Sequence, residues 1–221
     1  MTHSIHPRLC QLGAILLLLA GGCSSLRPPT PLPAFYSFDN ASGTAPATAQ
    51  AMAPRPTTGP TLIVNPPHAA AGFDSQRIIF VRTAHQLEYY AHSEWVDTPA
   101  RMLAPLIIAA VENGSTIRAV ILTPSAAVGD LRLDTEIIRL QHEVGSLPGR
   151  VRFTLRAYVV DNATRRVLAG REFDESVVAE SETPYGGVVA AHRAVQAVLV
   201  QLASLCNEAA STWRPPKADP R

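Results

Sequence analysis

The chain has 221 residues, of which 47% are hydrophobic and 17% are charged. These values predict one globular domain with attached tails, and the formal net charge of +1 argues against a nucleic-acid partner. The three cysteines, Cys10, Cys23 and Cys206, are too few for a disulfide framework, and no two of them have the spacing of metal ligands.

Residues 1–22 have the organisation of a secretory signal. Residues 1–8 contain one arginine and no acidic residue, and residues 12–20 form an uncharged apolar run. A run of this length rises only about 14 Å as a helix, whereas a bilayer span needs roughly 20 residues. The segment therefore fits the hydrophobic region of a cleaved signal peptide.

The residues after this run resemble the lipobox of bacterial lipoproteins, in which small residues precede a cysteine that becomes the first residue of the mature chain. Leu19, Ala20, Gly21 and Gly22 occupy these positions before Cys23. The usual pattern has leucine three residues before the cysteine, where this chain has Ala20. The resemblance implies a covalent lipid on the Cys23 thiol and no other cofactor; a plain secretory signal or an uncleaved anchor is the alternative.

Lipidation would change the charge, the thiols and the location of the mature chain. It would leave Cys206 as the only free thiol, and loss of Arg8 would leave 18 basic and 18 acidic residues. Two or three acyl chains, palmitate among them, would anchor the chain stably. By similarity to enterobacterial lipoproteins, Ser24 implies sorting to the outer membrane, with the domain facing the periplasm.

Residues 23–60 are expected to separate the anchor from the domain. Four prolines between residues 24 and 34 favour an extended tether of about 35 Å. The aromatic run Phe35–Phe38 predicts a short edge strand, with a hydrophobic patch in a disordered arm as the alternative. Residues 40–60 contain almost no large apolar side chains and predict a mobile loop.

The folded domain is expected at residues 61–210, before a disordered tail at 211–221. Apolar runs and alternation predict strands at 61–64, 77–82, 86–96, 118–122, 131–142, 151–159 and 167–178. Helical spacing predicts one helix from Pro99 to Asn113 and a long amphipathic helix over 187–210. This order predicts an α+β fold in which a mostly antiparallel sheet carries both helices on one face.

Three finer features follow from the same patterns. Pro105 should kink or split the first helix. The alternation slips by one face at Ile137 and Ile138, which predicts a β-bulge. Cys206 falls on the apolar stripe of the long helix and is expected in the core.

The chain resembles the ABC-type transport auxiliary lipoprotein family. The resemblance rests on the lipobox, the aromatic FYSF, the strands TLIV and RIIFVR and the run QLEYYAHSEWVDTPARML. Members of the family include PqiC-like and YmbA-like proteins, and the similarity extends over roughly residues 35–209. Its most specific part is Glu88 to Leu103. The resemblance implies a fold similar to the amino-terminal domain of TolB.

The resemblance also implies a function. Members of the family are periplasmic lipoproteins of MCE-type transporters, in which an ABC ATPase, a permease and an MCE-domain protein move lipids or other hydrophobic substrates across the envelope. The expected role is docking to the MCE protein without catalysis, and homo-oligomerisation is left open. An envelope scaffold similar to TolB, or a lipid carrier with its own cavity, are the alternatives.

Few residues suggest chemistry of their own. The sequence contains no nucleophile elbow and no glycine-rich phosphate loop, so an enzyme is not expected. His85 and His92 lie seven residues apart on a predicted strand, hence on opposite faces, which argues against a shared metal. Glu172 and Asp174 share a strand face and are expected to be solvated.

Surface recognition is the remaining possibility. Tyr90 and Trp95 are candidate partner contacts because aromatic side chains suit interface anchors. Tyr90 is expected to be more exposed than Tyr89, and packing of Tyr89 and Trp95 under a helix is the alternative. Arg152 and Arg156 share a strand face and are candidates for acidic partner groups or lipid phosphates, with a solvated face as the alternative.

Overall fold

In the computed structural model, which describes residues 32–38, 57–114, 116–145 and 147–215, the longest strand is β7, Leu131–Glu143. The described helices and strands belong to a compact unit that begins at Ala34. The signal segment, the lipobox with Cys23, most of the predicted tether and residues 40–56 of the predicted loop lie outside the described residues.

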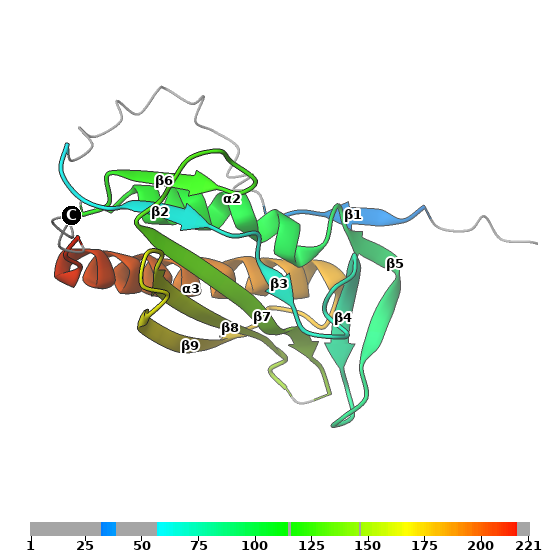
Figure 1. Cartoon of the computed structure of the whole chain (residues 1–221). Helices are drawn as coiled ribbons and strands as arrows, with labels where there is room; N and C mark the ends of the chain where they lie inside the picture. Colours follow the sequence, from blue (N-terminus) through cyan, green and yellow to red (C-terminus); the bar gives the residue numbers. More distant parts are fainter. Residues whose placement is uncertain (1–31, 39–56, 115, 146, 216–221) are drawn as a thin grey trace, which may run out of the picture. The chain divides into compact units, whose positions relative to one another are not determined.

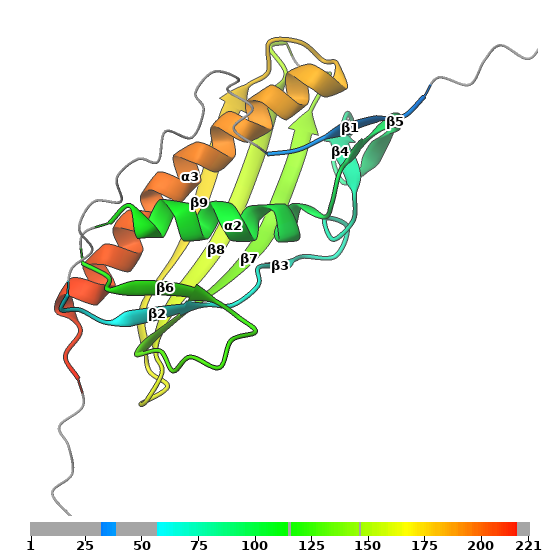
Figure 2. The same ribbon diagram turned by 90° about the horizontal axis from the view of Figure 1, so that it is seen from above.

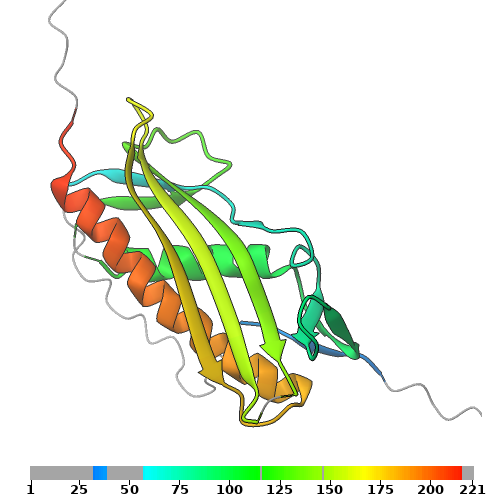
Figure 3. The same cartoon turned by 90° about the horizontal axis from the view of Figure 1, so that it is seen from below.

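On one edge of β7 lies an antiparallel ribbon of long strands. β8 (Arg150–Asp161) pairs with β7 along its whole length, and β9 (Val167–Val178) pairs with β8. The register of β7 shifts between Ile137 and Arg139, so the predicted bulge is confirmed. These three long strands form the curved part of the sheet seen from below in Figure 3.

The other edge of β7 is shared by three short strands that all run parallel to it. They are β2 (Thr61–Val64), β3 (His68–Ala69) and β4 (Arg77–Val81). β2 continues to β6 (Ala119–Leu122), which is also parallel, and β4 continues to β5 (Glu88–Trp95), which is antiparallel. β1 (Ala34–Tyr36) closes this end as a parallel edge strand beside β5 (Figure 1).

The α+β class is therefore confirmed, but the sheet is mixed and not mostly antiparallel. The reason lies in the chain path: β2, β3 and β4 follow one another in the same direction along one edge of β7, and the chain reaches β7 only after β5, α2 and β6. A connection of this length allows parallel pairs. All four residues of β2 are buried, as parallel strands covered on both faces usually are.

Both helices lie on one face of the β7–β9 ribbon, in front of it in Figure 2 and behind it in Figure 3. α2 (Pro99–Glu112) has proline at its first position, as predicted, and Asn113 is its C-cap. It is not split by Pro105, which lies on the exposed side of the helix. Water can there satisfy the carbonyl group that the proline leaves without an N–H donor.

α3 (Pro184–Thr212) supplies the apolar stripe that the sequence predicts, and Cys206 is fully buried within it. The helix is long and apolar enough to cross a membrane by length and composition. Half of its most apolar window is nevertheless buried in the domain, against β7, β8 and β9. Burial of Cys206 raises the pKa of its thiol to about 12, so it stays protonated and unreactive.

Candidate interaction surface

The face of the β7–β9 ribbon that points away from both helices carries interleaved charges from three strands. Among the described residues, no helix covers this face (Figure 3). Arg152 and Arg156 come from β8, and Glu172 and Asp174 come from β9. Both predicted arginines therefore lie on one face, as the strand periodicity indicates.

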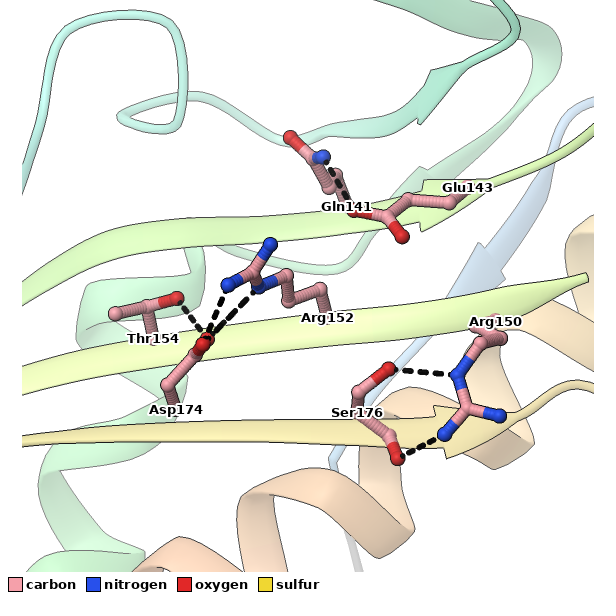
Figure 4. Close-up of polar contacts among 7 residues, drawn as sticks. All are labelled: Gln141, Glu143, Arg150, Arg152, Thr154, Asp174 and Ser176. Carbon is pink, nitrogen blue, oxygen red and sulfur yellow. Dashed lines mark hydrogen bonds and ion pairs between the residues drawn. The ribbon is translucent and has the colours of Figure 1, made fainter.

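Arg152 is held by the carboxylate of Asp174 (Figure 4). Its Nε donates to Asp174 Oδ1 at 3.0 Å and its Nη2 donates to Oδ2 at 2.6 Å. Thr154 Oγ1 donates to Asp174 Oδ1 at 2.7 Å. These hydrogen bonds lower the pKa of Asp174 to about 2, and the one from Arg152 has the largest effect.

Arg156 bridges two strands. Its Nη2 lies 2.9 Å from Glu172 Oε2, and its Nη1 lies 3.4 Å from Glu136 Oε2. Neither Arg156 nor Arg152 is thus a free cation, and Glu172 and Asp174 are ion-paired in addition to being exposed. Arg156 is directly opposite Glu172, whereas Asp174 is opposite Thr154, so Arg152 reaches Asp174 diagonally.

The exposures of Tyr89 and Tyr90 are the reverse of those expected. Tyr89 is 51% exposed and stacks on the Arg77 guanidinium, whereas Tyr90 is half-buried. Trp95 is only 3% exposed, so its candidate role as a surface contact is wrong. It packs beside α3, which is the alternative weighed for it. The cause is an irregular β4–β5 register, which lets Tyr90 and Trp95 face the same side although an odd number of residues separates them.

Tyr90 takes part in a polar cluster that sequence reasoning missed. Its hydroxyl donates to the backbone oxygen of Glu182 at 3.2 Å and lies 3.0 Å from His142 Nδ1. The hydroxyl therefore lies within hydrogen-bond distance of both groups. His142 Nε2 is buried and has no hydrogen-bond partner among the described residues. Burial raises the pKa of Tyr90 to about 12 and lowers the pKa of His142.

This cluster predicts acid sensitivity. The unfolded chain protonates His142 near pH 6.5, but the folded chain does so only at lower pH, so the unfolded state binds more protons in that interval. The free energy of unfolding should fall as pH decreases below about 6.5, by at most about 1.4 kcal/mol per pH unit. Urea unfolding between about pH 7.5 and pH 5 measures this slope.

The matched comparison is between His142→Phe and His85→Gln, since His85 is exposed. His142→Phe should flatten the dependence on pH, whatever it does to stability at neutral pH, and His85→Gln should leave it unchanged. Equal slopes in the wild-type chain and His142→Phe would contradict the assignment.

In the described part of the chain, no group of three or more histidine, cysteine, aspartate or glutamate side chains is arranged to hold a metal ion. The polar groups that are brought together are paired with one another across strands. What the geometry offers is a broad charged sheet face and, on the helix side of β7, a Tyr90–His142 pair.

The fold, an α+β domain whose mixed sheet is covered by two helices on one face, defines the structural class. A family model described as the ABC-type transport auxiliary lipoprotein component matches residues 43–203. The chain belongs to this family, which confirms the resemblance recognised in its sequence. It is accordingly an auxiliary lipoprotein of ABC-type transport, anchored to a membrane of the cell envelope.

Two solved structures support the fold. The protein XCC0632 from Xanthomonas campestris superposes with a TM-score of 0.64 at 24% identity, covering 71% of this chain and 88% of that chain. An uncharacterized protein superposes with a TM-score of 0.59 at 10% identity, covering 79% of this chain and 98% of that chain. No curated protein matches the sequence.

Proposed function

We propose that the chain is a periplasmic accessory subunit of an MCE-type ABC transporter that moves lipids or other hydrophobic substrates. Cys23 anchors it to the outer membrane, and the folded domain docks on the MCE-domain protein without catalysing a reaction. The observation that carries the proposal is the family match over residues 43–203, in a chain whose sequence resembles a lipobox at Cys23. The MCE partner and the hydrophobic substrate come from what the family resemblance implies.

The packing of the domain favours docking over lipid carriage. The small pocket that β4, β7 and α3 line has a volume of about 10 Å³, which is room for about one water molecule and not for an acyl chain. The remainder of that region is filled by apolar side chains such as Ile78, Trp95 and Leu140. A carrier would need an apolar cavity many times larger.

Affinity purification tests the proposal directly. The full-length chain, tagged and expressed in its native host, is crosslinked mildly, extracted in detergent and purified, and its partners are identified by mass spectrometry. We expect an MCE-domain protein together with an ABC ATPase and a permease. An unrelated outer-membrane lipoprotein with the same tag controls for proteins that merely share the membrane.

The outcomes separate the alternatives. An ABC ATPase without an MCE protein would keep the auxiliary role and overturn the MCE assignment. Recovery of cell-wall or outer-membrane assembly factors alone would favour a scaffold similar to TolB. Lipid extracted in stoichiometric amounts from the purified domain, beyond the lipid on Cys23, would favour a carrier.

A further inference from the structure

An open groove of about 710 Å³ lies where the turn between β4 and β5 stands over β7 and β8. The turn contributes Arg82, His85 and Leu87 to one wall. Ile138 and Arg139 come from the bulge of β7, and Arg152 comes from β8. We call this feature the arginine groove.

The charged side chains that line it are mostly basic. Three arginines and one histidine line it beside Glu143, while Arg152 is paired with Asp174 and Arg82 lies 3.9 Å from Glu88. Glu143 Oε1 already accepts a hydrogen bond from Gln141 Nε2 at 3.0 Å (Figure 4). The electrostatic potential of the groove should therefore favour an anion.

The arginines differ in how far their donors are used. Arg139 is half-buried, and its guanidinium makes no hydrogen bond among the described residues, although its charge lowers the pKa of Asp174. Arg82 is 63% exposed and reaches Glu88 only at 3.9 Å. Arg152 uses two nitrogens on Asp174, and Figure 4 shows the third pointing toward β7. Guanidinium donors left free in a partly desolvated place form strong charge-assisted hydrogen bonds with carboxylates.

Apolar side chains lie beside these cations. Leu87 is 47% exposed, and Ile138 is half-buried on the opposite wall. A ligand that uses both features must carry a negative charge next to an aliphatic group. A free phosphate would leave the apolar wall unused, and an acyl chain would remain in contact with water in so open a groove, which forfeits the hydrophobic gain.

We propose that the arginine groove binds an extended acidic peptide segment of a protein partner. One carboxylate lies against Arg139, within reach of Arg82 and the free nitrogen of Arg152, and a neighbouring aliphatic side chain packs on Leu87 and Ile138. The groove is several times larger than a single carboxylate, which suits a short stretch of chain. The inference does not depend on the identity of the transporter partner, because peptides stand in for it.

The test uses the purified full-length chain in detergent and an array of short peptides with aspartate or glutamate next to leucine or valine. Each acidic peptide is paired with its asparagine or glutamine counterpart, and the tightest pairs are measured by fluorescence anisotropy. Acidic peptides should bind about ten-fold tighter than their amide counterparts. Raising the salt concentration from about 50 to about 500 mM should weaken the binding.

Arg139→Gln should lower the affinity about ten-fold. Arg132→Gln is the matched control, because Arg132 lies half-buried on the same strand and face, pairs with Asp134 at 2.9 Å and does not line the groove. Arg82→Gln, at an exposed position, repeats the test should Arg139→Gln fail to fold. Thermal melts of all three variants establish that they are folded.

Three results would overturn the proposal. One is the absence of any acidic peptide that is preferred over its amide counterpart. Another is an equal loss of affinity in Arg132→Gln and Arg139→Gln. The third is binding that depends on Arg139 only for inorganic phosphate or for phosphatidylglycerol vesicles, which would assign the groove to phosphate ligands.

Discussion

Replacing Trp95 with alanine should lower the free energy of unfolding by about 3–5 kcal/mol. The indole is 3% exposed and its ring centroid lies 4.7 Å from that of Phe38, which is 2% exposed. Trp95 is also paired with Tyr36, and Val96 N donates to Tyr36 O at 2.8 Å. Removal of the indole would open a cavity and release the contact that holds β1 and Phe38 against β5.

Tyr89→Ala is the control for this prediction. It removes an aromatic ring from the same strand, but Tyr89 is 51% exposed and its described contact is with the Arg77 guanidinium. The expected loss is about 1 kcal/mol or less. Urea unfolding at neutral pH measures both variants, and equal losses would show that Trp95 does not anchor the core.

The double variant Phe38→Ala, Trp95→Ala adds a second readout. Because the two rings contact each other, the combined loss should be smaller than the sum of the single losses by about 0.5–1.5 kcal/mol. Strict additivity would mean that the two side chains stabilise the domain independently.

The features that the sequence predicts well are local ones. The buried stripe of α3, the bulge at Ile137 and the hairpin at residues 161–164 all follow from periodicity and turn chemistry within a few residues. Whether two strands pair parallel or antiparallel depends on residues far apart in the sequence, and apolar alternation within one strand does not predict it. The continuous apolar runs of β2 and β4 carried the relevant signal, since such runs are typical of parallel strands.

The surface was harder to predict than the fold for two physical reasons. The β4–β5 register is irregular, Tyr90 faces inward and Tyr89 is exposed. No residue type in that strand predicts the irregularity. The contact between Tyr90 and His142 joins positions that are 52 residues apart on different strands. The ion pairs of Arg152 and Arg156 depend on the β8–β9 register, which shifts between Val159 and Val160, so counting outward from the turn gives the wrong opposite residues.

Replacing Cys23 with serine should abolish lipid attachment and leave the chain as an unprocessed precursor. Only a thiolate can form the thioether that carries the acyl chains, and a serine hydroxyl is far less nucleophilic than a thiolate at neutral pH. Incorporation of labelled palmitate and the apparent mass on a gel measure the two effects. Cys10→Ser, within the predicted signal peptide, is the matched control and should be labelled and processed like the natural chain.

The same variant connects the anchor to the proposed function. Without acyl chains the chain loses the stable membrane attachment that two or more of them provide, so the precursor should leave the outer-membrane fraction in a density gradient and lose its partner in the affinity purification. The folded domain begins at Ala34, well after Cys23, so its unfolding free energy should be unchanged. Labelling or fractionation that is the same with serine as with cysteine would refute the lipobox and, with it, the outer-membrane assignment.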